Sequence, residues 1–289
     1  MNERLYARLA ARLQRGPQVL ASVLDTRGAT PRKAGARMLI DAQDSEYSIG
    51  GGLAEARVLA AAQDLLQTAG QACLLTIELN GLPGAAGVCG GQMQLALRRW
   101  HGPADQQRAD ALAATLASGA WVQLSAEDAG HPLGAVRVDA DPRLLIVGGG
   151  HCGHALYELA RYVDFEQWIF DPRPEYAEPA RFPGAHCLSG EHAVLRQALD
   201  TPRALYAVLL NRDFHSDVAT LRVIAGARFA FLGMMGSQRR IRHVLAALPE
   251  QAAALSTLQA PVGIEIEAET PHEIAISILA HLIRTRRGA

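Results

Sequence analysis

The strongest constraint on the fold of this chain is a glycine motif that follows an apolar run in its second half. Residues 144–156 read LLIVGGGHCGHAL, and the pattern G-x-G-x-x-G falls on Gly148, Gly150 and Gly153. In such a motif the first glycine makes a tight turn, the second lets a pyrophosphate approach the backbone, and the third packs a helix on a strand. The sequence therefore predicts a strand that ends near Gly148 and a helix that starts directly after the turn.

The surroundings of the motif favour nucleotide binding. Asp171 ends the next apolar run, 23 residues after Gly148, and an acidic residue at about this distance contacts the ribose hydroxyls in dinucleotide-binding units. Phosphates would lie at the helix N-terminus, where free N–H groups and the helix dipole favour an anion. The Asp171 carboxylate would repel a 2′-phosphate, so NAD is favoured over NADP. The alternative is a glycine turn that binds no nucleotide. His151, inside the motif, could face a ligand or be solvated, whereas Cys152 is expected to pack in the helix.

The second half alternates apolar runs with helical patterns, which indicates a parallel sheet with right-handed crossovers. Candidate strands cover residues 144–147, 167–171, 185–188, 205–210 and 229–232, and candidate helices cover residues 153–163, 192–199, 217–225, 238–247 and 271–286. Thr270 is the expected N-cap of the last helix. A polar, proline-marked stretch at residues 139–142 separates this pattern from the first half, so we expect domains at residues 1–140 and 141–289.

The first half contains a second glycine-rich turn. Gly50, Gly51 and Gly52 stand between a short predicted strand and a predicted helix over residues 53–68, an arrangement that could also receive an anion. The alternative is a tight turn in which glycine only supplies positive φ. Arg32 and Lys33 could add counter-charge for a phosphate, or be ordinary solvated residues of a basic loop.

A cysteine with two glycines behind it is the other feature of the first half. Cys89 precedes Gly90 and Gly91, within a strand predicted over residues 88–97. The glycines leave space for a bulky partner to reach the sulfur, and a thiolate is a soft metal ligand and a nucleophile. The alternative is a small buried residue in a strand, the commoner fate of a free cysteine. Spacing alone favours that alternative.

Charge and cysteine content exclude several classes of protein. The 28 basic and 29 acidic residues leave a net charge of -1, so the chain has no broad basic field for nucleic acid or an acidic membrane surface. Four cysteines without a C-x-x-C pair are too few for a disulfide scaffold. No run approaches the ~18 apolar residues of a membrane span. We therefore expect a reduced, cytoplasmic protein without a membrane span.

Seven blocks of the sequence, in order, resemble the XdhC/CoxI family of molybdenum-hydroxylase maturation factors. They read ATPRKAGARML at residues 29–39, SIGGGLAEA at 48–56, VCGG at 88–91, LLIVGGGHCGHAL at 144–156, FDPRPEYA at 170–177, FLGMMGSQRR at 231–240 and PVGIEIEAETPHEIAISILAHLI at 261–283. The last block is the most specific. Together the blocks cover nearly the whole chain and are a much stronger signal than the glycine motif alone.

The resemblance implies a smaller N-terminal α+β XdhC/CoxI domain and a C-terminal Rossmann-like domain. It implies binding of the molybdenum cofactor, as molybdopterin or its cytosine dinucleotide form. Family members protect this cofactor, assist its sulfuration by a cysteine desulfurase, and insert it into an apo molybdenum hydroxylase such as xanthine dehydrogenase. It also implies a homodimer, and a maturation factor more than an enzyme.

Site residues follow from the same resemblance. Cys89 would hold the cofactor as a metal ligand, flanked by Gly90 and Gly91. The glycines of the 144–156 block would cradle a nucleotide, either NAD or the dinucleotide tail of the cofactor. There are departures: Leu53 replaces a cysteine that many members have after the triple glycine, and residues 211–215 read NRDFH where members often have a His-Asp-His or Arg-Gly-His stretch.

Other interpretations remain open at this point. The glycine motif with Asp171 would also suit an NAD-dependent oxidoreductase acting on a small substrate, although the sequence offers no convincing acid–base pair. A scaffold that brings a desulfurase to its target is a third possibility. Four carboxylates in the last block could serve a metal or general base, or be solvated charges at a helix start; they are Glu265, Glu267, Glu269 and Glu273.

Overall fold

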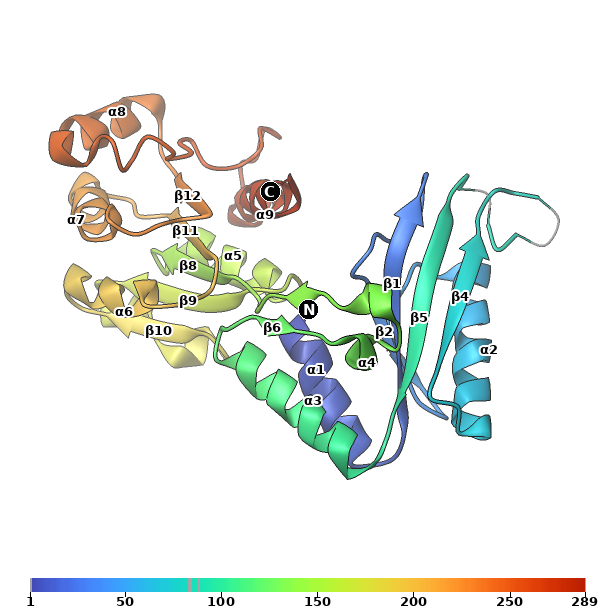
Figure 1. Ribbon diagram of the computed structural model, residues 1–289. Coiled ribbons are helices and arrows are strands. Elements are labelled where there is room, and N and C mark those ends of the chain that lie inside the picture. Colours follow the sequence, from blue (N-terminus) through green and yellow to red (C-terminus); the bar gives the residue numbers. More distant parts are fainter. Residues whose placement is uncertain (1, 83–84, 88, 289) are drawn as a thin grey trace. The chain divides into compact units, whose positions relative to one another are not determined.

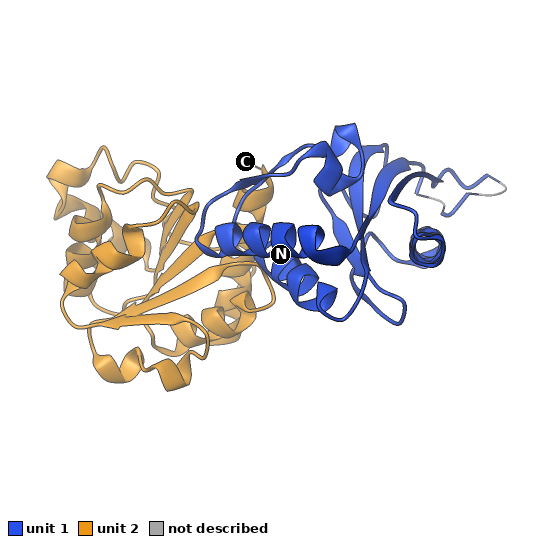
Figure 2. Ribbon diagram, turned by 60° about the horizontal axis from the view of Figure 1, so that its bottom comes forward, with its two compact units in different colours: residues 1–140 blue, residues 141–289 orange. Residues whose placement is uncertain are grey.

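The computed structural model describes residues 2–82, 85–87 and 89–288, and its chain divides into unit 1, residues 1–140, and unit 2, residues 141–289 (Figure 2). The elements of unit 1 are α1 (Asn2–Leu13), β1 (Gln18–Arg27), β2 (Arg37–Ile40), β3 (Ser45–Tyr47), α2 (Gly52–Thr68), β4 (Ala72–Glu78), β5 (Gln92–Trp100), α3 (Gly102–Ala117), β6 (Val122–Gln123), α4 (Ala126–Ala129) and β7 (Arg137–Val138). Those of unit 2 are β8 (Arg143–Val147), α5 (His151–Ala160), β9 (Glu166–Asp171), β10 (His186–Ser189), α6 (Leu195–Leu199), β11 (Leu205–Leu209), α7 (Phe214–Ile224), β12 (Phe231–Met234), α8 (Gln238–Ala246) and α9 (Pro271–Gly288).

Unit 1 is built on an antiparallel sheet in the order β3-β2-β1-β5-β4 (Figure 1). Helix α2 covers one face, and α1 with α3 covers the other. The alternation of β1 explains why both faces are covered, since successive side chains of a strand point to opposite faces. Val19 and Ala21 join the core under α2, whereas Leu20 packs with Trp100 in the core under α1 and α3.

Unit 2 has a five-stranded parallel sheet in the order β10-β9-β8-β11-β12. Counted within the unit this is 3-2-1-4-5, the order of the Rossmann fold, which confirms the predicted fold class. In β8, Leu145 and Val147 pack toward α7 and α8, while Leu144 and Ile146 pack toward α5 and α9. This double-sided burial is why the strand is apolar throughout.

The predicted elements are present, with instructive errors at their ends. Strand β5 starts at Gln92, so residues 89–91 belong to the preceding loop and the prediction of a strand from residue 88 was wrong there; Val88 itself lies outside the described residues. Gly90 has a φ of 82°, which a regular strand does not accommodate. Strand β12 starts two residues later than expected, and the helix predicted over residues 192–199 is a 3₁₀ turn followed by the short α6.

The start of α9 follows the prediction. The Glu273 N–H donates to the Thr270 hydroxyl at 3.3 Å, and the Glu273 carboxylate accepts from the Thr270 N–H at 2.8 Å. These reciprocal bonds form a capping box, as Thr270 at the N-cap requires. Among the described residues, no helix has both the length and the apolar character that a membrane crossing needs.

Candidate functional sites

The glycine turn of unit 2, residues 148–153, joins β8 to α5, and the requirement for glycine differs from one position of the turn to the next. Gly148 has a φ of 107°, which only glycine adopts without strain. A Cβ on Gly153 would lie 1.9 Å from the Gly148 carbonyl oxygen, so α5 can pack on the turn only without one. A Cβ on Gly150 would meet no atom within 4 Å. The backbone at Gly150 is therefore open to an approaching group.

The carboxylate of Asp171 is engaged by its own chain. It is 1% exposed and accepts from the Gly149 N–H at 3.0 Å, the Arg173 N–H at 3.1 Å, and the Arg173 guanidinium at 2.9 and 3.0 Å. Because Arg173 neutralises the carboxylate, the repulsion of a 2′-phosphate that we expected from Asp171 does not apply to this arrangement. A ribose could reach Asp171 only after Arg173 moved away.

The segment after β9 closes over the same turn. The Tyr176 carbonyl oxygen would lie 1.9 Å from a Cβ on Gly149. Arg181 donates to the Gly149 carbonyl at 3.0 Å, and the Arg173 guanidinium stands 3.8 Å from the Tyr176 ring centroid. The turn is thus locked on the side of Gly149 and accessible on the side of Gly150.

His151 is exposed at the first position of α5. Its Nδ1 lies 3.4 Å from the Arg212 guanidinium, which brings two polar groups to the accessible side of the turn. The described residues supply no side-chain cap to the α5 N-terminus. Cys152 is partly buried and packs against the core below α5, as predicted.

Sequence reasoning missed a buried polar cluster beside the turn. Asp217 is fully buried. Its carboxylate accepts hydrogen bonds from the Asn211 amide at 3.2 Å and from Arg240 Nε at 2.8 Å. The Arg240 guanidinium also donates to the Asn211 carbonyl at 2.8 Å. Burial raises the pKa of Asp217, and the Arg240 bond opposes that rise. Asn211 follows β11, and Arg240 lies in the first turn of α8, which follows β12. The rule that the carboxyl ends of parallel strands meet at the same side of a sheet could therefore have found this cluster.

In unit 1 three predicted features come together around the basic loop at residues 28–35. A Cβ on Gly91 would lie 2.2 Å from the Ala29 carbonyl oxygen, and one on Gly28 would lie 2.8 Å from the Gly90 carbonyl oxygen. At the other end of the loop, a Cβ on Gly50 would lie 2.5 Å from the Pro31 side chain. Gly28 and Pro31 are three residues apart, a reach of at most about 11 Å. We call residues 28–33, 50–52 and 89–91 the glycine cluster of unit 1.

The exposed parts of this cluster are free of close contacts. A Cβ on Gly51, Gly52 or Gly90 would meet no atom within 4 Å. All three residues have positive φ, so the need for glycine in these turns also explains them without a ligand. Glu55 bends back over the start of α2, where its carboxylate accepts from the Gly51 N–H at 3.1 Å and from the Ser48 hydroxyl at 2.7 Å.

Cys89 is the exposed cysteine of the chain, while Cys73, Cys152 and Cys187 are partly buried. Burial raises the pKa of each of these three, which lowers their thiolate fraction at neutral pH.

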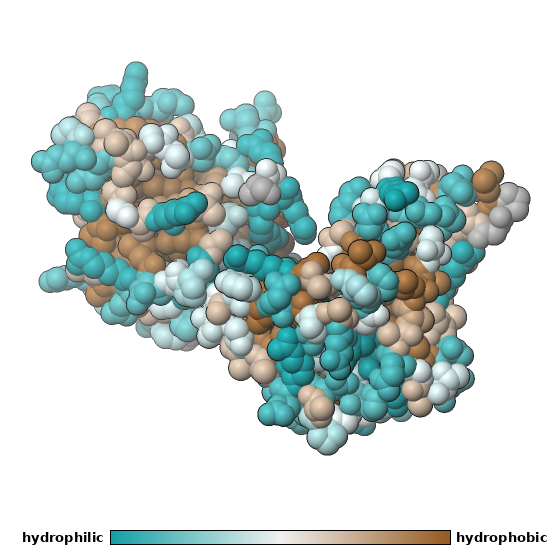
Figure 3. All heavy atoms as spheres, in the orientation of Figure 1, coloured by the Kyte–Doolittle hydropathy of each residue, from teal (hydrophilic) through white to brown (hydrophobic). Residues whose placement is uncertain are grey.

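Leu53, at the position of the family's second cysteine, is 64% exposed. Figure 3 shows apolar side chains at the surface of unit 1 among hydrophilic ones. Within the described ranges, no group of three or more His, Cys, Asp or Glu side chains could hold a metal ion.

The acidic block of residues 265–273 has structural roles. The Glu273 carboxylate accepts from the N–H groups of Glu269 and Thr270 at 3.0 and 2.8 Å, and these bonds lower its pKa. Glu265 accepts from the Glu267 N–H at 3.0 Å. Local backbone bonding thus accounts for Glu265 and Glu273 without a metal.

Comparison with known proteins gives consistent matches along the chain. Residues 144–282 match the XdhC Rossmann domain, and residues 11–78 match the XdhC and CoxI family. YqeB, an uncharacterized protein of Escherichia coli (strain K12), is 29% identical over 284 residues, which are 96% of this chain and 45% of that protein. A protein of Bacillus subtilis (strain 168) named as a probable xanthine dehydrogenase subunit is 29% identical over 153 residues, which are 52% of this chain and 45% of that protein.

A solved structure shares the fold. The crystal structure of a protein described as a xanthine dehydrogenase from Bacillus halodurans has a TM-score of 0.82, with 99% of this chain and 96% of that chain covered at 23% identity. The alignments span less than half the length of the two curated relatives. The two family matches lie in the expected order, one in each unit, and the chain belongs to the XdhC and CoxI family.

Proposed function

We propose that this chain is a maturation factor for a molybdenum hydroxylase of the xanthine dehydrogenase type, and that it holds the molybdenum cofactor at the glycine cluster of unit 1. The observation that carries the proposal is the exposed Cys89 thiol beside the uncrowded backbone of Gly90. Family membership and the Bacillus subtilis relative named for xanthine dehydrogenase support it.

The residues present fit such a group. Gly51, Gly52 and Gly90 leave the space that side chains would otherwise fill, and the Cys89 sulfur is a soft ligand suited to molybdenum. Arg32 and Lys33 are exposed on the loop between the two glycine sites, where they would neutralise the phosphate of the pterin. When bound, the cofactor brings the redox-active metal that the target hydroxylase uses, and this chain serves to bind and shield it.

The finer steps are part of the same proposal. The chain would present the cofactor for sulfuration by a cysteine desulfurase and pass it to the apo-hydroxylase, acting in the cytoplasm as a homodimer.

In unit 2 we propose that the accessible side of the glycine turn binds phosphate groups, with Gly150 approaching them and His151 and Arg212 beside them. Gly148 and Gly153 shape the turn. Asp171 would contact a ribose only if Arg173 released it. The occupied carboxylate gives no support to an NAD-dependent oxidoreductase, whose ribose contact is usually a free acidic residue.

The test uses the full chain purified from a host that makes molybdenum cofactor. Bound molybdenum, oxidised pterin and released nucleotide are measured per chain for the wild type, for Cys89→Ser and for the matched control Cys187→Ser. We expect pterin and molybdenum with the wild type and the control, and a loss of at least about tenfold with Cys89→Ser. Equal retention by the two variants would remove Cys89 from the site, and NAD without pterin would favour the oxidoreductase.

A further inference from the structure

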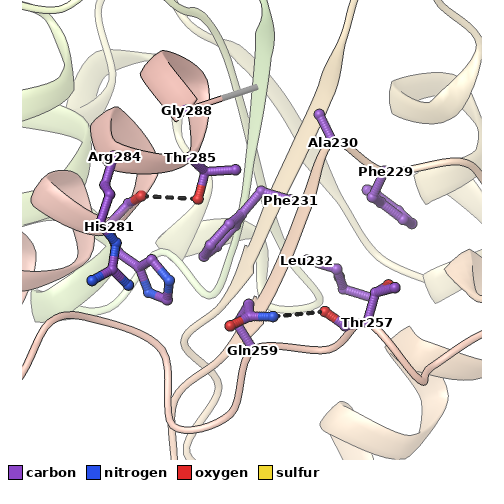
Figure 4. Close-up of a pocket in the computed structure, with 10 residues that line it drawn as sticks. All are labelled: Phe229, Ala230, Phe231, Leu232, Thr257, Gln259, His281, Arg284, Thr285 and Gly288. Atoms are coloured by element: carbon purple, nitrogen blue, oxygen red, sulfur yellow. Dashed lines mark hydrogen bonds between the residues drawn. The ribbon is translucent and has the colours of Figure 1, made fainter.

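A separate pocket of unit 2 lies between the start of β12 and α9 (Figure 4). Its volume is about 440 Å³, within the range of sites for small molecules. All five strands of the sheet are parallel. The glycine turn follows the carboxyl end of β8, so it lies at the opposite end of the strands from the start of β12. The proposed phosphate site therefore does not include this pocket.

His281 supplies a buried donor to the pocket. The residue is 7% exposed, and its Nδ1 accepts from the Gly263 N–H at 3.2 Å. Burial, together with the nearby Arg284 charge, lowers the pKa of His281, so the ring is neutral at pH 7 and carries its proton on Nε2. The Nε2 atom forms no hydrogen bond with the described residues, which leaves a directed N–H available to a ligand.

Arg284 adds a positive charge one turn along the same helix. Its side chain is exposed and lines the pocket, and among the described residues it forms no hydrogen bond or ion pair. Figure 4 shows Arg284 and His281 together on α9, with the His281 ring next to Phe231. A guanidinium with five free N–H donors is suited to a planar oxyanion.

Phe231, at the start of β12, supplies an aromatic ring next to His281. The Phe231 ring packs edge-on against His281, with centroids 4.9 Å apart and planes at 79°. Phe229 and Leu232 also line the pocket, but they pack into the core on the other face of the sheet. Gln259 donates its amide N–H to the Thr257 carbonyl at 3.2 Å, which holds its side chain at the rim. The pocket thus combines a cation and a neutral donor with aromatic and aliphatic side chains.

We infer that this pocket binds a small organic anion with a planar apolar body, namely an aromatic or heteroaromatic carboxylate. Arg284 and the Nε2–H of His281 hold the carboxylate, and the ring of the ligand lies against Phe231. A neutral amide of the same shape loses the charge-assisted bonds, and a short acid such as acetate loses the contact with Phe231. The site is independent of the proposed function, so either could fail while the other stands.

Isothermal titration of the full chain with benzoate tests the inference. We expect benzoate to bind, benzamide to bind at least about tenfold more weakly, and inorganic phosphate and acetate to bind more weakly than benzoate. Arg284→Gln should weaken benzoate binding about tenfold, and Arg284→Lys less, because the charge remains without the planar fork. The matched control Arg222→Gln, on α7, should bind benzoate as the wild type does.

Three results would overturn the inference. The first is the absence of benzoate binding at concentrations up to about 50 mM, since a weaker dissociation constant would not describe a specific site. The second is equal affinity for benzoate and benzamide. The third is an unchanged benzoate affinity in Arg284→Gln. Thermal unfolding of each variant checks that the protein is folded. Since Arg284 makes no bond within the described residues, its substitutions should leave the melting temperature unchanged.

Discussion

The two glycine sites of the molecule differ in what the missing side chains are for. In the glycine turn of unit 2, Gly149 and Gly153 are closely covered by backbone from Tyr176 and Gly148. In the glycine cluster of unit 1, Gly51 and Gly52 face empty space. Both sites use some glycines to let the chain pack on itself, but the turn leaves one glycine uncrowded, Gly150, whereas the cluster of unit 1 leaves Gly51, Gly52 and Gly90 uncrowded.

This difference teaches how to weigh a glycine motif. The turn of unit 2 has the familiar spacing, yet most of that spacing is explained by the packing of α5 and by the segment after β9. The cluster of unit 1 has no familiar pattern, but it joins an exposed thiol, a basic loop and accessible backbone. The predictions below test this contrast, from the largest expected effect to the smallest.

Substituting Gly153 by alanine should give the largest effect. Its Cβ would lie 1.9 Å from the Gly148 carbonyl oxygen, and relieving such a backbone clash should cost about 3 kcal/mol or more of the free energy of unfolding. Gly150→Ala, on the same turn with φ -69° and no atom within 4 Å, should change stability by less than about 1 kcal/mol. Urea unfolding of both variants measures the difference. Equal stabilities would show that the turn is not locked.

Asp171→Asn should have the next largest effect. The buried carboxylate accepts bonds from Gly149 and Arg173, and losing its charge should cost about 2 kcal/mol. The Arg173 side chain is 54% exposed, so solvent compensates it and Arg173→Gln should cost about 1 kcal/mol or less. Chemical denaturation checks both values, and a stability of Asp171→Asn within experimental error of the wild type would contradict the proposed lock.

Thiol reactivity compares the two sites directly, because each contains a cysteine. Cys89 is exposed in the glycine cluster, whereas burial raises the pKa of Cys152 in the turn. With a disulfide reagent at pH 8 we expect one thiol to react at least about tenfold faster than the others. Cys89→Ser should abolish this fast phase, and Cys152→Ser should retain it. A fast phase that survives in Cys89→Ser would place the accessible thiol elsewhere.

The start of α9 provides a control helix terminus with a small, pH-dependent effect. Unlike α5, it is capped by its own Glu273, whose pKa is lowered by bonds from the Thr270 and Glu269 N–H groups. A carboxylate with a lowered folded pKa stabilises the protein above its unfolded pKa of 4.5, and this stability is lost as the pH falls through the folded value. Glu273→Gln should therefore be slightly less stable than wild type at pH 7.

The difference should disappear well below pH 4.5, when both side chains are neutral. Thermal unfolding at a series of pH values follows it. A constant difference at all pH values would mean that the carboxylate charge does not cap this helix.

Much of the fold could be predicted from local patterns. The apolar run before Gly148 and the strand–helix alternation after it predict a parallel sheet, and the Val and Leu content of residues 18–25 predicts a strand. The start of β5 was misjudged because alternating apolar residues from Met93 onward hide the turn that Gly90 makes before them. Short-range periodicity cannot distinguish a strand from the loop that leads into it.

The sites were predicted less completely. The motif spacing identified Asp171 and the glycines of residues 148–153, whereas only the resemblance to the XdhC/CoxI family made Cys89 a candidate. The partners of Asp171 could not be anticipated, because Gly149 lies 22 residues away and Arg181, which holds the same glycine, lies 32 residues from it. Such contacts depend on the path of an irregular segment between β9 and β10. No local pattern in the sequence specifies that path.

The edge of the parallel sheet at β12 has a consequence for association. The Gln259 N–H donates to the Leu232 carbonyl, and the Gln259 carbonyl accepts from the Met234 N–H. These bonds use backbone groups that an edge strand would otherwise offer to a neighbouring molecule. In unit 1, β4 is an outermost strand of seven residues. Aggregation by strand addition in a partly unfolded chain would therefore start at β4 before it started at β12.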